Sequence, residues 1–265
     1  MKAFLVHTHC NTHFWKCMVL AIVTAISYSV LYQFVMPVIY QIENGLIFYG
    51  VISIMILFVS CIVLGFVVYL ANIKQECSEF HYKKMLIPCI AVMLILVICM
   101  LGLGILSFQM AIHQEQQLFA YVINALLLLA CMFYVPVIVF SYLEIRMGKK
   151  NPLLIIKCAF EKMMHHYQSV FYSTLIIAFL VIGYRYMMDS VFSISMGVTL
   201  YDLPLELLSR WVPFLDLPSL LTSALDNASL WSVVIVSFVS QFVLCAAYIL
   251  YVFYMICIHD EDISV

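Results

Sequence analysis

The stretch that decides the fold is an apolar run near the C-terminus, from Leu230 to Ile258, which reads LWSVVIVSFVSQFVLCAAYILYVFYMICI. It contains no Asp, Glu, Lys, Arg or His. A bilayer hydrocarbon core about 30 Å thick needs roughly 20 apolar residues in a helix, because every backbone N–H and C=O must be satisfied without water. The sequence therefore predicts that this run crosses a membrane as an α-helix.

Five more stretches meet the same requirement, and none carries a charged residue or His near its centre. The composition agrees, since 66% of the 265 residues are hydrophobic and 10% are charged, against roughly a quarter charged in soluble domains. We expect one all-α membrane domain over residues 1–265, a polytopic bundle of about six transmembrane helices. The predicted spans cover residues 18–40, 45–71, 85–112, 118–143, 170–188 and 230–258.

Orientation follows from the positions of Lys and Arg, which favour the cytoplasmic side of a membrane. With the N-terminus inside, only Arg185 and Arg210 of the twelve basic residues fall on the external side. Six spans then return the C-terminus to the cytoplasm. The cytoplasmic basic residues are Lys2, Lys16, Lys74, Lys83, Lys84, Arg146, Lys149, Lys150, Lys157 and Lys162.

The cytoplasmic connector over residues 151–168 has the pattern of an amphipathic helix. Asn151 is suited to cap its N-terminus, and Pro152 fits the first helical position, where a missing N–H costs nothing. Phe160 and Met163 belong to the predicted apolar face, whereas Lys157 lies elsewhere on the helix. These three residues are candidates either for contact with the membrane surface or for docking a cytoplasmic partner.

The external segment over residues 189–229 contains a short repeat. Asp202-Leu203-Pro204 recurs as Asp216-Leu217-Pro218, and leucines follow each copy at helical spacing. We expect two short interfacial helices here. They would form either a structural cap over the bundle or a lid over a substrate path.

Uncharged polar residues inside the spans leave two possibilities open. Gln33, Asn124 and Gln241 could line a path for a neutral solute, or they could join helices by hydrogen bonds, which is the common use of such residues in lipid.

The N-terminal run includes His7, His9, Cys10 and His13, whose imidazoles and thiol could hold a soft metal ion. The run lacks a zinc-site spacing, so a hydrated tail is the alternative. No cofactor is expected, because metalloprotease, hydrolase, P-loop and dinucleotide motifs are missing from the sequence. Nucleic acid is not an expected partner, since the chain lacks a concentrated basic face.

The segment from Tyr142 to Met163 reads YLEIRMGKKNPLLIIKCAFEKM, a basic turn followed by Asn-Pro and an amphipathic helix. Together with six spans, it resembles the YciC-like bacterial inner-membrane proteins and the membrane domains of some glycerophosphodiester phosphodiesterases. The resemblance implies a multi-pass protein of the bacterial inner membrane and brings no catalytic residues with it.

These observations favour a non-enzymatic membrane component, either an accessory subunit or an envelope-maintenance protein. Its expected partners are the lipid bilayer and other membrane or cytoplasmic subunits. The alternative is a permease or channel-forming subunit for a neutral or apolar solute. A membrane-embedded lipid enzyme is the third hypothesis.

Overall fold

The computed structural model describes residues 14–23, 82–112, 117–192 and 230–261, with isolated positions between 26 and 68 and at 224–225. Every regular element in these ranges is a helix, which confirms the all-α prediction for the described part of the chain. The long helices are α4 (Tyr82–Ile112), α5 (Gln117–Arg146), α6 (Pro152–His165), α7 (Tyr167–Phe192) and α10 (Trp231–Glu261).

Two helices in the described residues are long and apolar enough to cross a membrane. They are Tyr167–Tyr184 within α7 and Trp231–His259 within α10, at the predicted fifth and sixth spans. Helices α4 and α5, of 31 and 30 residues, run unbroken through the predicted third and fourth spans. Most of the first two predicted spans, and most of the external segment in which two short helices are expected, lie outside the described residues.

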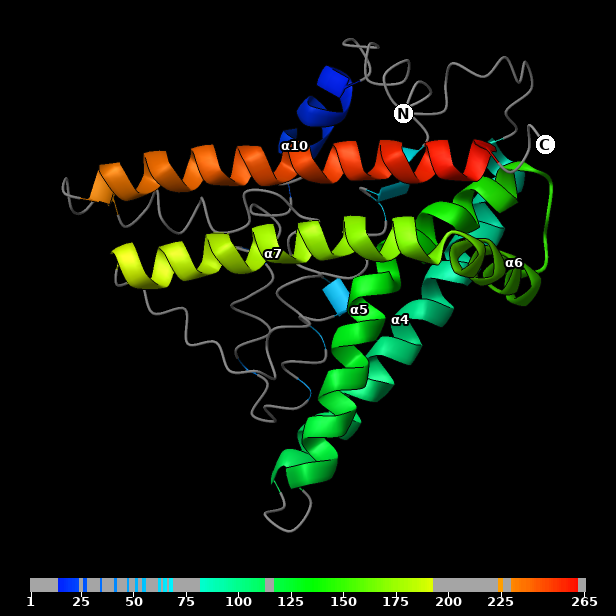
Figure 1. The fold of residues 1–265 in the computed structure, drawn as a ribbon, viewed down its shortest axis with the longest axis horizontal. Helices are drawn as coiled ribbons and strands as arrows, with labels where there is room; N and C mark the ends of the chain where they lie inside the picture. The colour runs from blue at the N-terminus through cyan, green and yellow to red at the C-terminus, as the bar shows by residue number, and fades with distance from the viewer. Residues whose placement is uncertain are drawn as a thin grey trace.

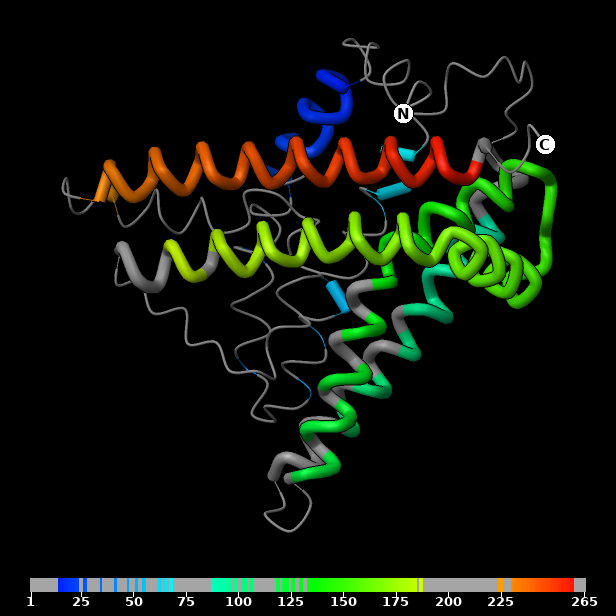
Figure 2. The backbone as a smooth tube through the Cα atoms, in the orientation of Figure 1, coloured from blue at the N-terminus to red at the C-terminus, as the bar shows by residue number. Residues whose placement is uncertain are grey.

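The helices form two arms (Figure 1). Helices α7 and α10 lie side by side and antiparallel, and we call them the α7–α10 arm. Helices α4 and α5 form a second antiparallel pair, the α4–α5 arm. The tube in Figure 2 shows the arms diverging from a common end, beside the short helix α6. Residues far apart in the sequence therefore meet at this one junction.

Burial is concentrated at the junction. All residues of α5 from Tyr134 to Ile145 are buried except Tyr142, whereas its first half exposes bulky apolar side chains such as Leu118 and Leu126. A helix that is apolar on all sides is stable only when it is surrounded. The last turns of α10, from Tyr251 to His259, are buried almost as completely. The C-terminal half of α5 is thus the centre of the fold.

A glycine allows a close contact between Gly65 and the Tyr142 side chain at this centre. A Cβ at Gly65 would lie 2.9 Å from the Tyr142 hydroxyl oxygen. That hydroxyl donates a hydrogen bond to Met93 Sδ, at 3.2 Å. Small residues at helix contacts let large neighbours pack closely, as is common in membrane bundles. The contact joins α5 to α4 and to the region predicted as the second span.

Candidate functional site

The most unusual site in the described residues is a buried ionic cluster at the junction. The Glu144 carboxylate is 0% exposed. Its Oε1 lies 2.8 Å from Lys162 Nζ and 3.3 Å from His259 Nε2, and its Oε2 forms an ion pair with Lys149. Lys162 Nζ and His259 Nε2 are themselves 3.1 Å apart. We call Glu144, Lys149, Lys162 and His259 the Glu144 cluster.

The turn after α5 brings Lys149 back to Glu144. Gly148 has φ +91°, the left-handed conformation that glycine adopts without a Cβ penalty. Its N–H donates to the Ile145 carbonyl at 3.0 Å, and the Lys149 N–H donates to the Glu144 carbonyl at 3.4 Å. This is the Schellman pattern, which satisfies the last carbonyls of a helix. The same turn places the Lys149 ammonium next to the Glu144 carboxylate.

The start of α6 brings in Lys162. The predicted cap is confirmed: Asn151 Oδ1 accepts a hydrogen bond from the Leu153 N–H at 3.1 Å, and Pro152 is the first helical residue. Helix α6 then buries Ile155, Ala159 and Met163, spaced four residues apart on one side. Lys162 precedes the last of these and reaches inward from the edge of the buried side to Glu144.

The cluster keeps the carboxylate charged. Burial raises the pKa of Glu144, but hydrogen bonds from Lys149 and Lys162 outweigh burial and hold that pKa below its usual range. The Glu144 carboxylate in turn raises the pKa of Lys149. Glu144 follows the predicted fourth span directly, at the start of the connector that the sequence predicts to be cytoplasmic. A paired, enclosed carboxylate is suited to fixing three segments together rather than to exchanging protons.

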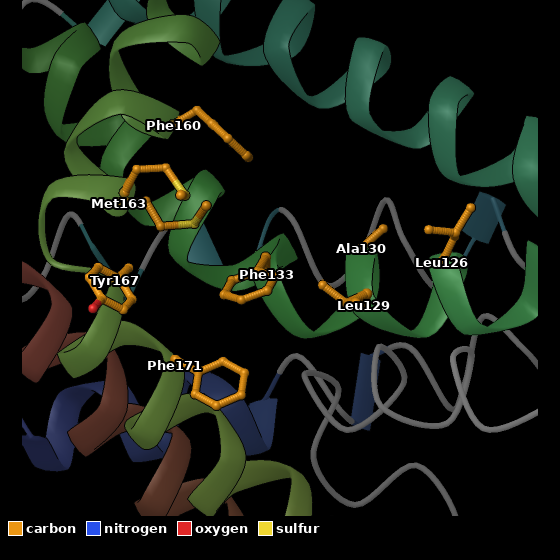
Figure 3. A pocket seen from close by; sticks show the side chains of 9 residues that line it. Leu126, Leu129, Ala130, Phe133, Phe160, Met163, Tyr167 and Phe171 are labelled. Atoms are coloured by element: carbon orange, nitrogen blue, oxygen red, sulfur yellow. The ribbon is translucent and has the colours of Figure 1, made fainter.

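An apolar groove of about 480 Å³ lies between α5, α6 and α7. Figure 3 shows side chains of three helices around it, with Met163 and Tyr167 at one end and Leu126 at the other. The groove is lined by Leu126, Leu129, Ala130 and Phe133 of α5, Phe160, Met163 and Met164 of α6, and Tyr167 and Phe171 of α7. It lies where the two arms begin to diverge.

The structure separates the three residues proposed for surface or partner contact. Phe160 is 50% exposed and Met163 is 2% exposed, although both line the groove. Lys157 lies on the exposed side of α6, 3.8 Å from Glu161 in a solvated ion pair. The exposed apolar side of α6 therefore consists of Phe160 with Leu153, Leu154 and Met164, whereas Met163 anchors the helix inward.

Of the three residues proposed for a polar path, one has a described side chain. Gln241 is 2% exposed, and its Nε2 donates to the Tyr184 hydroxyl at 3.0 Å and to the Ser237 hydroxyl at 3.2 Å. Another bond between α7 and α10 joins the hydroxyls of Thr174 and Tyr251, 2.5 Å apart. Gln33 and the Asn124 side chain lie outside the described residues.

The proposed metal ligands His7, His9, Cys10 and His13 also lie outside the described residues. Within the described ranges, no group of three or more His, Cys, Asp or Glu side chains could hold a metal ion.

Sequence reasoning did not find the Glu144 cluster. Its signal was weak: Glu144 is an acid at the end of a span, at the start of a basic connector, and His259 follows an apolar run. Their 115-residue separation hides the contact. No protein family, curated protein or solved structure matches this chain.

Proposed function

We propose that this chain is a non-enzymatic, multi-pass protein of the bacterial inner membrane, with about six spans and both termini in the cytoplasm. In this proposal it is an accessory subunit or envelope-maintenance component. Helix α6 is its interaction surface on the cytoplasmic side. The observation that carries the proposal is that the Glu144 cluster fixes α6 to the ends of both arms, while α6 turns Leu153 and Phe160 outward.

The outer surfaces of the long helices support membrane embedding. An exposed apolar patch of more than a few hundred Å² on a soluble monomer usually marks an interface or a membrane contact. Here all four arm helices expose bulky apolar residues, and those of α5 and α10 lie in the parts away from the junction. Among them are Ile87, Leu94 and Ile98 of α4, Leu118, Phe119 and Leu126 of α5, Ile176 and Phe179 of α7, and Ile235, Val239 and Val243 of α10.

Charge supports the placement of α6 at the cytoplasmic surface. Between residues 144 and 166 the chain has five Lys or Arg and two Glu, a net charge of +3 with His neutral. Basic residues next to membrane spans are retained in the cytoplasm and are attracted to anionic lipid. The junction of the two arms would then face the cytoplasm.

Topology reporters test the membrane part of the proposal. Alkaline phosphatase is active only outside the cytoplasm and green fluorescent protein mainly inside it. We expect fluorescence from fusions after Lys150 and after Val265, and phosphatase activity from a fusion after Asp202. Phosphatase activity at Lys150, or fluorescence at Asp202, would contradict the proposed map.

Photocrosslinking tests the accessory role. A benzoylphenylalanine at Leu153, on the exposed side of α6, is expected to crosslink to one membrane or cytoplasmic protein in intact cells. The matched control is the same residue at Phe179, which is exposed on α7 far from α6. Equal labelling patterns at both positions would argue against α6 as the interaction surface.

A permease is the second candidate, because one observation favours it. Gln241 Oε1 is buried without a hydrogen-bond partner, and a neutral solute could use such an acceptor. In a permease, Gln241→Met would abolish solute-dependent swelling of proteoliposomes. In an accessory protein, wild type and variant would both show no swelling, and the variant would lose some thermal stability because the Gln241 Nε2 bonds to Tyr184 and Ser237 are removed.

A further inference from the structure

We infer that the apolar groove between α5, α6 and α7 binds an acyl chain of an anionic phospholipid from the cytoplasmic leaflet, whose head group contacts Lys157. The inference rests on the proposed membrane topology and extends it by naming a ligand for the groove.

The lining of the groove fits a hydrocarbon chain. Its nine residues are aliphatic, aromatic or thioether side chains, and the one polar atom among them is the Tyr167 hydroxyl. That hydroxyl accepts a hydrogen bond from Gln168 Nε2 at 3.0 Å. A volume of about 480 Å³ falls within the roughly 300–1,000 Å³ of small-molecule sites. Methionines at Met163 and Met164 suit a flexible ligand, because their side chains adapt to irregular shapes.

The direction of the groove matches that of a lipid tail. Tyr167 and Phe160 mark its end at α6, and Leu126 marks its other end (Figure 3). Leu126 precedes Phe133 by seven residues of α5, which is about 10 Å along the helix axis. In the proposed topology, α6 lies at the cytoplasmic surface and Leu126 lies deeper in the bilayer. The groove therefore begins at head-group level and continues into the hydrocarbon.

Positive charge at the α6 end of the groove favours an anionic head group. On a helix, residues separated by three or seven positions share a face, so Lys157 lies on the same side of α6 as Phe160 and Met164. Its side chain is 70% exposed, and an exposed pair such as Lys157 with Glu161 contributes little stability. Lys157 can therefore turn to a phosphate while the net positive segment 144–166 attracts it.

The test is native mass spectrometry of the full chain, released from mild detergent and titrated with phosphatidylglycerol or phosphatidylcholine. Wild type is expected to retain one phosphatidylglycerol. Ala130→Trp fills the groove and should lower the bound fraction at least about tenfold, whereas Val122→Trp, on exposed α5 outside the groove, should not. Lys157→Gln should remove the preference for phosphatidylglycerol over phosphatidylcholine, and Lys150→Gln should keep it.

A second pair of variants covers the case in which Ala130→Trp does not fold. Met164→Glu places a charge in the groove at an exposed position of α6, and Leu154→Glu places the same charge outside it. Loss of lipid in the first and retention in the second supports the inference.

Equal lipid retention by each groove variant and its control would overturn the inference, and so would a protein or a second copy of this chain retained in place of lipid. If the topology reporters agree with the proposed map and lipid retention fails, only the groove inference is wrong.

Discussion

At Glu144, a carboxylate is removed from water and surrounded by basic side chains from three other segments. A buried ion pair is costly to form, but removing one member leaves buried charge uncompensated. The lysines are partly solvated, with Lys149 33% and Lys162 24% exposed, so part of the charge would still reach water. The cluster therefore holds α5, α6 and α10 together, and its contribution to stability depends on the single Glu144 carboxylate.

Glu144→Gln should lower the free energy of unfolding by about 2 kcal/mol, below the roughly 3–5 kcal/mol of fully buried pairs because of this solvation. Thermal unfolding in detergent, followed by tryptophan fluorescence, measures the change. Glu161→Gln is the matched control, since Glu161 is 62% exposed and its pair with Lys157 contributes little. Equal unfolding midpoints for the two variants would show that the Glu144 cluster does not stabilise the fold.

The cluster also predicts how stability depends on pH. Because the folded-state pKa of Glu144 is lowered, its contribution is fully present above the usual value of about 4.3 and is lost as pH falls through the lowered folded-state pKa. The raised pKa of Lys149 works in the opposite direction, so its contribution is present below about 10.4 and is lost as pH rises through the raised value.

Unfolding midpoints measured from pH 3 to pH 11 check both signs. The difference in stability between wild type and Glu144→Gln should be constant near neutrality and should shrink at the two extremes. A difference that grows as pH falls below 4 would show that Glu144 is not held in its charged form.

At the scale of elements, the turn between α5 and α6 determines which residues meet at the junction. Gly148 ends α5 and directs Lys149 back over the helix end, and the Asn151 cap then starts α6 at once. Between these two signals the chain has only Lys149 and Lys150. A connector this short fixes the position of α6 against α5, so Lys162 reaches Glu144 only if both signals hold.

Gly148→Ala should destabilise the protein by about 1–2 kcal/mol, because a residue with a Cβ is strained at φ +91°. No atom lies within 4 Å of the position that a Cβ would occupy, so the cost comes from the backbone and not from a clash. Gly183 lies inside α7, and a Cβ there would also have no atom within 4 Å. Gly183→Ala should therefore be neutral or stabilising by up to about 1 kcal/mol. Chemical denaturation of both variants in detergent gives the comparison; equal effects would mean that the left-handed turn does not matter.

At the scale of the molecule, the two arms share one contact region. The hydrophobic core there combines Phe140 of α5, Val170 of α7 and Val252 of α10, and the Glu144 cluster lies at its end, beside α6. The arms diverge away from this region (Figure 1). The apolar groove lies between α5, α6 and α7. Association of the arms should therefore depend on the junction.

Expressing the chain as two fragments, residues 1–150 and 151–265, should yield a complex, because the break lies in an exposed turn and the core spans both pieces. A tag on one fragment should recover the other from detergent extracts. With Glu144→Gln the complex should separate at a lower urea concentration, and with Glu161→Gln it should behave as the unmodified pair does. Failure of the unmodified fragments to associate would show that the junction does not join the arms.

Several features followed from local patterns. The apolar runs predicted the continuous helices α4, α5, α7 and α10, and Asn151 with Pro152 predicted the start of α6. The inner side of α6 was harder to predict. Ile155, Ala159 and Met163 face inward, whereas Phe160 is half exposed. Apolar residues occur on several sides of α6, so the sequence pattern alone does not identify the side that is buried.

The sequence by itself determined that the chain forms long apolar helices and where α6 begins, because hydropathy and capping act over a few neighbouring residues. Only the tertiary structure decided that Glu144 meets His259 across 115 residues, and that three helices enclose an apolar groove. Those contacts depend on which helices pack together and at what inclination, and apolar surfaces that are alike on every side do not specify either one.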